Sequence, residues 1–233
     1  RRRRLESHPL GLIVFSHRRH KALSGLKLIV GLGNPGPAYA DTRHNVGAVW
    51  VRELARRYSI SLGVDTKFKG EIGRGLIGGT DVRLLLPSTF MNNSGESVGA
   101  VSRFFKLEPQ EILVAYDEVA FEPGVVKLKQ GGGSNGHNGV KSVIAGLGNR
   151  DEFVRLRIGV GHPGSKVQVI PYLTKQTPRQ SEREQIAAAG DFSDALIADM
   201  MRGEWQLAMT TLHAPETEPA KAPEKAKPNP GET

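Results

Sequence analysis

Three asparagines, one histidine and one aspartate follow short apolar segments of this chain, at points where strands would end. They are Asn34, His44, Asn92, Asp117 and Asn138. Amides donate and accept hydrogen bonds without charge, so a cluster of them suits a substrate with peptide-like groups and an oxyanion that forms on attack. Together with a histidine base, this set favours hydrolysis at a carbonyl carbon by activated water, and we expect no serine triad.

His44 is the candidate general base. It would lie in the first turn of a helix capped by Asp41 or Thr42, where the positive end of the helix dipole disfavours imidazolium. A general base must be neutral near pH 7, and an acid such as Asp117 on the other ring nitrogen would fix its tautomer. The position equally fits a histidine that bonds a neighbouring carbonyl, and each asparagine fits an ordinary turn.

A metal site is a weaker interpretation of the same residues. It would use His44, Asp117, His137 and His162, but no two of these histidines lie at a short ligand spacing on one element. We therefore expect neither a metal nor a cofactor.

A dinucleotide loop is a second weak interpretation. Residues 31–36 fit Gly-x-Gly-x-x-Gly after an apolar run. However, Pro35 and Pro37 have no N–H to donate to phosphate, and no acid ends a second strand at the required distance. The loop must present some other group.

The elements that would position these side chains alternate between strand-like and helix-like segments. This alternation predicts an α/β fold, a single domain with a twisted, mixed and mostly parallel sheet and helices on both faces. A capping box, Ser181-x-x-Glu184, predicts another helix start, and Gly203 could break the last helix, 193–213. The predicted strands are LKLIVGL, DVRLLLP, EILVAYD, VVKLKQ and VRLRIGV, and the predicted helices are 42–58, 92–106 and 138–147.

Composition limits the class of protein. The 233 residues include no cysteine, which excludes disulfides and thiolate chemistry, and no apolar run is long enough to span a bilayer. Residues 1–24 hold seven Lys or Arg and one acid, so this segment carries most of the net charge of +8. We expect 1–24 to be a disordered basic extension that only loosely imitates a targeting peptide, 25–213 the folded domain, and 214–233 a disordered tail.

Five long motifs stand in order along the chain, namely GLGNPGPAYADTRHNVG, LLLPSTFMNNSG, ILVAYDE, GVVKLKQGGGSNGHNGVKS and RLRIGVGHPG. Together they resemble the bacterial-type peptidyl-tRNA hydrolases. The resemblance covers about Leu26 to His213 and implies a monomeric, cytoplasmic α/β enzyme without cofactor or obligate protein partner. It implies hydrolysis of the ester that joins a peptide to the terminal ribose of tRNA, which recycles tRNA from prematurely released peptidyl-tRNA.

The resemblance also implies a role for each matching residue. His44 matches the general base, Asp117 the acid that orients it, and Asn34, Asn92 and Asn138 the amides that position the substrate. Further matches are Met91 in the cleft, Tyr39 near the terminal nucleotide, and Lys127, Lys129 and Arg157, which would hold tRNA phosphate. The strand pattern agrees in part, because Lys127 and Lys129 are two residues apart and share one face.

Some positions depart from the family pattern. Tyr116 stands where histidine is common, Ala120 where an acid often follows, and Pro171 and Thr174 lie in the expected lid segment. These changes put the motion of the lid and the release of product in question more than the hydrolysis itself. An RNA-binding relative that no longer hydrolyses, as in some organellar members of the superfamily, is the competing hypothesis. The intact His44, Asp117, Asn34 and Asn138 argue against it, whereas the basic extension, as a potential organelle signal, leaves it and an organellar location open.

Overall fold

Seven strands form one mixed sheet in the computed structural model, which describes residues 25–214. The strand order is β2-β3-β4-β1-β5-β7-β6. The four central strands, β4, β1, β5 and β7, are parallel, and the pairs β2–β3, β3–β4 and β6–β7 are antiparallel. The strands are β1 Leu28–Gly31, β2 Gly63–Asp65, β3 Gly70–Ile77, β4 Thr80–Pro87, β5 Ile112–Glu118, β6 Val126–Gln130 and β7 Val154–Gly159.

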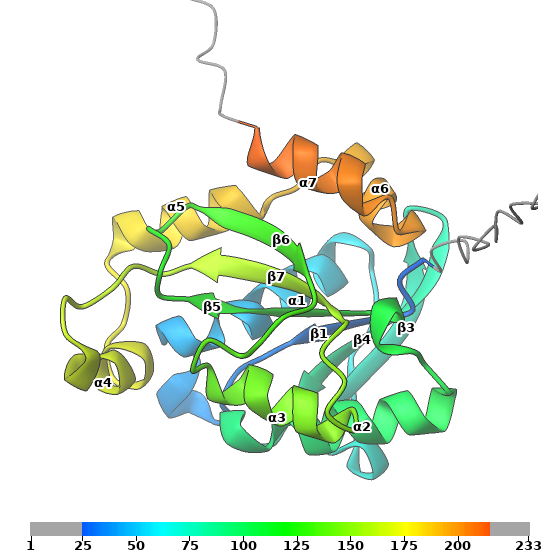
Figure 1. Cartoon of the computed structure of the whole chain (residues 1–233), viewed down its shortest axis with the longest axis horizontal. Helices are drawn as coiled ribbons and strands as arrows, with labels where there is room; N and C mark the ends of the chain where they lie inside the picture. Colours follow the sequence, from blue (N-terminus) through cyan, green and yellow to red (C-terminus); the bar gives the residue numbers. More distant parts are fainter. Residues whose placement is uncertain (1–24, 215–233) are drawn as a thin grey trace, which may run out of the picture.

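Seven α-helices of the described region cover both faces of this sheet (Figure 1). Side chains alternate along β1, so Ile29 packs with α1, α6 and α7, whereas Leu28 and Val30 pack with α2 and α3. The predicted α/β architecture is confirmed. The helices are α1 Val46–Arg57, α2 Ser94–Phe105, α3 Asn138–Gly146, α4 Val169–Thr174, α5 Gln180–Gly190, α6 Asp194–Arg202 and α7 Trp205–His213.

The five predicted strands correspond to β1, β4, β5, β6 and β7, and the break at Gly203 is confirmed by its left-handed backbone. The capping-box prediction was wrong. Helix α5 begins at Gln180, and the Glu182 carboxylate, not that of Glu184, accepts from the backbone N–H of Arg179 at 2.7 Å. The predicted extensions are 1–24 and 214–233, and all of their residues except residue 214 lie outside the described part of the chain. No helix within 25–214 is long and apolar enough to cross a membrane.

Strand β6 does not end beside the carboxyl ends of the parallel strands, as the sequence pattern suggested, but at the opposite end of the sheet. It runs antiparallel to β7, so Gln130 pairs with Val154, the first residue of that strand. The glycine-rich segment 131–136 then leads back to α3, and the buried guanidinium of Arg155 donates to the carbonyls of Gly132 and Gly133. Arg155 was not among the predicted site residues, although it orders this segment.

Two glycines allow α2 and α3 to cross in close contact. A Cβ atom on Gly95 would lie 1.8 Å from the carbonyl oxygen of Ser142, and one on Gly146 would lie 2.1 Å from that of Gly95. Side chains cannot occupy this space without moving a helix.

We therefore expect Gly95→Ala to lower the free energy of unfolding by about 1–3 kcal/mol or more, because the added methyl group overpacks the helix crossing. Urea unfolding measures the change. Gly63→Ala is the matched control, because a Cβ atom there meets nothing within 4 Å. An unchanged unfolding midpoint for Gly95→Ala would contradict the close crossing.

Candidate active site

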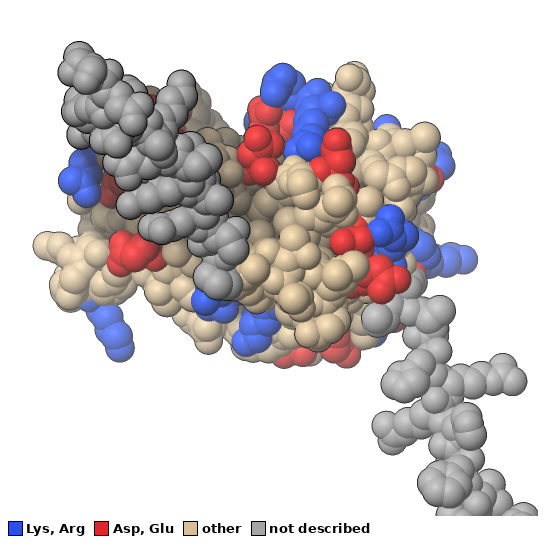
Figure 2. Space-filling view, turned by 90° about the horizontal axis from the view of Figure 1, so that it is seen from above, with Lys and Arg blue, Asp and Glu red and all other residues tan. Residues whose placement is uncertain are grey.

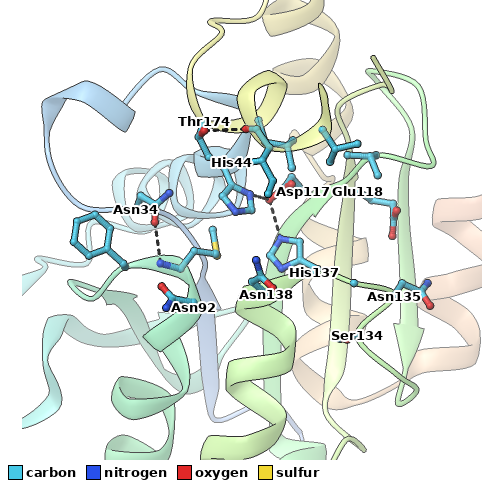
Figure 3. A pocket seen from close by; sticks show the side chains of 17 residues that line it. Asn34, His44, Asn92, Asp117, Glu118, Ser134, Asn135, His137, Asn138 and Thr174 are labelled. Atoms are coloured by element: carbon cyan, nitrogen blue, oxygen red, sulfur yellow. Dashed lines mark hydrogen bonds and ion pairs between the residues drawn. The ribbon is translucent and has the colours of Figure 1, made fainter. Parts of the chain in front are cut away.

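A cavity of about 490 Å³ opens at the carboxyl ends of the parallel strands, between α3 and α4. The turns after β1 and β4, the end of β5 and the start of α3 bring their polar side chains to this one place, as Figure 3 shows. Its lining residues include the five polar residues from which the sequence analysis started, namely Asn34, His44, Asn92, Asp117 and Asn138.

His44 is joined to Asp117 at the base of the cavity. Its Nδ1 atom lies 2.8 Å from Asp117 Oδ1, and both residues are buried. Burial alone would raise the pKa of Asp117, but the charges and hydrogen bonds of His137 and His44 outweigh it and hold that pKa well below its usual range. The carboxylate is therefore ionised and accepts the Nδ1 proton, which leaves Nε2 of His44 to accept a proton from substrate water.

The sequence analysis expected a helix dipole to lower the pKa of His44, whereas in the structure the net shift of that pKa is upward. His44 lies in a 3₁₀ turn, η2 (Arg43–Asn45), which precedes α1, and the Thr42 hydroxyl donates to Tyr39 instead of capping the turn. Burial lowers the pKa of His44, but the negative charge and hydrogen bond of Asp117 raise it more, so the pKa lies above its ordinary value of 6.5. The Asp117 carboxylate therefore decides the direction in which the pKa of His44 shifts.

His137 is a second histidine on the same carboxylate. Its Nε2 atom lies 2.9 Å from Asp117 Oδ1, and its Nδ1 accepts from the backbone N–H of Val140 at 3.2 Å, as the N-cap of α3. Because Nδ1 accepts, the ring proton is on Nε2 and points to Asp117. The sequence analysis gave His137 no role in hydrolysis, and its only signal was its place beside Asn138.

The same three residues are those of the metal hypothesis, without His162. Their ligand atoms lie within 4.8 Å of one another. In the structure both histidine nitrogens that face Asp117 form hydrogen bonds to one carboxylate oxygen. His162 instead accepts from the N–H of Gly164. The arrangement is a hydrogen-bonded pair of rings around a buried acid.

Asn34 is held in one orientation by its neighbours. Its side-chain oxygen accepts from the backbone N–H of Met91 at 2.8 Å, so its NH₂ group remains as the donor toward the cavity (Figure 3). Asn45 fixes the backbone of Asn34 through two hydrogen bonds of 2.8 and 2.9 Å. The sequence analysis overlooked Asn45, although it directly follows His44.

Ser134 also lines the cavity and stands in a Gly-x-Ser-x-Gly spacing, at residues 132–136. It is not a nucleophile elbow, because the preceding strand ends at Gln130, and its hydroxyl has no hydrogen bond to His44 or His137 among the described residues. The geometry favours water as the nucleophile.

Comparison with known proteins identifies the family of this chain. Residues 28–221 match the family model described as peptidyl-tRNA hydrolase. The chain belongs to the peptidyl-tRNA hydrolase family. It is 48% identical over 192 residues to the peptidyl-tRNA hydrolase of Pseudomonas fluorescens Pf-5, covering 82% of this chain and 98% of that one. A crystal structure of peptidyl-tRNA hydrolase from Acinetobacter baumannii superimposes with a TM-score of 0.79 at 45% identity, covering 82% of this chain and 96% of that one.

Four residues that the family resemblance assigned to the substrate do not line the cavity. Tyr39 stacks edge-on against Phe90, which does line it, with ring centroids 6.3 Å apart. Lys127 and Lys129 are exposed on β6. Arg157 donates to Glu118 Oε2 at 3.0 and 2.8 Å and is largely buried, so a phosphate would share this guanidinium with a carboxylate.

Proposed function

We propose that this chain hydrolyses the ester between an N-blocked aminoacyl or peptidyl group and the 3′-terminal ribose of tRNA, with His44 as general base. The observation that carries the proposal is the His44–Asp117 pair at 2.8 Å, inside a cavity lined by asparagine amides. Membership of the peptidyl-tRNA hydrolase family supports the reaction and its substrate.

In this mechanism His44 Nε2 takes a proton from water as the water oxygen attacks the ester carbon. Asp117 holds the ring tautomer and stabilises the imidazolium that forms. The tetrahedral intermediate then collapses, and the imidazolium returns the proton to the ribose oxygen that leaves. The NH₂ group of Asn34 is the best-oriented donor for the oxyanion, whereas Asn92 and Asn138, at the exposed mouth of the cavity, would hold the peptide groups.

An N-blocked substrate fits this lining better than a free amino acid ester. The described amides are neutral, and the cavity's carboxylates are engaged, Asp117 by two histidines and Glu118 by Arg157. A free ammonium group would lose water there without a matching counter-charge. We therefore expect the enzyme to spare ordinary aminoacyl-tRNA.

The test is single-turnover release of the acyl group from N-acetylaminoacyl-tRNA and from the unblocked aminoacyl-tRNA. We expect fast release from the first and release near the spontaneous rate from the second. Binding of both RNAs without release of either would instead support the competing hypothesis, a non-hydrolysing RNA-binding relative.

Lys127 and Lys129 are proposed to contact tRNA phosphate, with Arg157 behind them. Val126 and Leu128 are buried and both lysines are exposed, as the strand pattern predicted. Figure 2 shows one face of the molecule, where Lys and Arg are interspersed with Asp and Glu, so its visible described surface offers no continuous basic area.

Lys127→Ala and Lys129→Ala are each expected to weaken tRNA binding and to reduce the slope of log affinity against log salt by about 1, because each removes about one phosphate contact. Filter binding at several salt concentrations measures both. Lys67→Ala is the control, since Lys67 lies next to β2 at the opposite edge of the sheet. Equal slopes for all four proteins would contradict the assignment.

We further propose that the enzyme acts as a monomer, without an obligate protein partner. One chain supplies the base, its acid and the amides of the cavity. Peptidyl-tRNA arises on ribosomes, so the compartment must contain them, and the cytoplasm meets this requirement. Sedimentation at the enzyme's working concentration tests the monomer.

A further inference from the structure

Arg43, the residue before the proposed base, is buried beneath the segment that closes the cavity. It is 4% exposed, and its guanidinium forms three contacts with one stretch of chain. Nη2 lies 2.7 Å from Glu182 Oε2 on α5, Nη1 lies 3.3 Å from the carbonyl oxygen of Gln176, and Cζ lies 4.0 Å from the ring centre of Tyr172 on α4. One side chain thus joins η2 to α4, to α5 and to the loop between them.

Helix α4 depends on such contacts for its position. It has six residues, too few for a helix that is stable alone, and Pro171 lies within it. Four of its residues line the cavity, namely Val169, Ile170, Leu173 and Thr174. On the opposite side, Tyr172 stacks on Arg43 and donates its hydroxyl to the carbonyl of Val160 at 2.7 Å. The contacts of Tyr172 therefore fix the position of α4, which forms this wall of the cavity.

The ion pair is shielded from water. The side chains of Arg43 and Glu182 are 5% and 12% exposed, and Arg43 Nε is buried without a hydrogen-bond partner. Burial raises the pKa of Glu182, but the Arg179 N–H and the charge of Arg43 lower it more, so the carboxylate stays ionised. Because desolvation offsets much of the attraction in a buried pair, its main effect is on geometry, not on global stability.

We propose that Arg43 is a positioning residue that, through Glu182, Gln176 and Tyr172, holds α4 over the cavity and thereby sets how tightly the acyl part of the substrate is bound. The inference rests on the proposed function for its substrate. No hydrogen bond joins the Arg43 side chain to His44 or Asp117 among the described residues. We call the contacts of Arg43 with Glu182, Gln176 and Tyr172 the clasp. Loss of the clasp should therefore weaken substrate binding more than it slows the chemical step.

The experiment compares wild type, Glu182→Gln, Arg43→Lys and the double variant. Glutamine keeps an acceptor for the Arg179 N–H but removes the charge, and lysine removes the planar fork and its stacking. Glu71→Gln is the matched control, because Glu71 pairs with Arg52 in an exposed site on the other side of α1. The measurements are kcat and KM for N-acetylaminoacyl-tRNA, the pH profile of kcat, and hydrogen exchange of residues 169–176.

For Glu182→Gln we expect KM to rise about tenfold while kcat stays within about twofold, with faster exchange in 169–176. Arg43→Lys should give the same changes in KM, kcat and exchange. The double variant should have a KM little higher than that of either single variant, because both changes break the same clasp. The pH profile should not move.

Unchanged exchange and KM in both variants would overturn the proposal. A fall in kcat with a shifted pH profile would also overturn it, because that result places Arg43 in the control of His44 instead of α4. If the wild type releases no acyl group, the proposed function fails, while the exchange data still decide whether the clasp holds α4.

Discussion

His44→Ala is expected to lower the single-turnover rate of acyl release by about 10²- to 10⁴-fold, the usual contribution of a positioned general base. His137, the other histidine that lines the cavity, is not placed to replace it. The ring of His137 has its Nε2 proton directed at Asp117 and its Nδ1 occupied by the Val140 N–H, so it offers no free nitrogen to water. Quenched-flow release of an N-acetylated amino acid measures the loss.

Two controls make this result interpretable. Urea unfolding of His44→Ala shows whether the fold is retained, and His162→Ala removes an exposed histidine whose hydrogen bond goes to Gly164. We expect His162→Ala to be close to wild type. A His44→Ala enzyme that folds normally and keeps its rate would show that the base lies elsewhere.

Asp117→Asn is expected to lower the same rate by about 10²-fold or more, with two distinct causes. An amide NH₂ group facing His44 Nδ1 would donate to it and place the ring proton on Nε2, which then cannot accept from water. Where the amide oxygen faces the ring instead, His44 has lost the negative charge that raises its pKa.

The second cause has a direction that can be measured. General-base activity follows the unprotonated fraction of His44, so the rate is small below its pKa and complete above it. Removing the charge of Asp117 lowers that pKa, and the rising limb of residual activity should move to lower pH. A residual activity with the wild-type midpoint would show that Asp117 does not control the ionisation of His44.

The sequence predicted the parallel core of this fold but missed one edge of its sheet. Strands β1 and β5 begin with continuous apolar runs that are buried on both faces, and β4 ends with one, which is a strong local signal. Strand β7 alternates Val, Leu and Ile with two arginines, which is also a strand pattern. Strand β3 contains Gly70, Gly73 and Gly75, which disfavour a strand locally. At two of these positions a side chain would not fit, because a Cβ atom on Gly73 would collide with the Ser61 carbonyl and one on Gly75 with the Ile60 side chain. Such a tertiary reason leaves no trace in one sequence.

The candidate site was predictable where its residues lie at parallel strand ends, and less so elsewhere. Asn34 and His44 follow β1, and Asp117 lies at the carboxyl end of β5, which pairs in parallel with β1, so these ends must meet. His137 arrives from the antiparallel β6 through the loop ordered by Arg155, a return path that periodicity cannot show. Arg43 and Glu182 are 139 positions apart, so no local pattern could pair them.

The central claim is that neutral His44 takes a proton from the attacking water. The most direct measurement is the pH dependence of single-turnover acyl release, corrected for spontaneous ester hydrolysis, beside an NMR titration of His44 in the same enzyme. The account predicts that the rate rises with pH along the titration of His44, with both midpoints above the ordinary value of 6.5. A rate that is independent of pH across that titration, or that falls as His44 loses its proton, would contradict it.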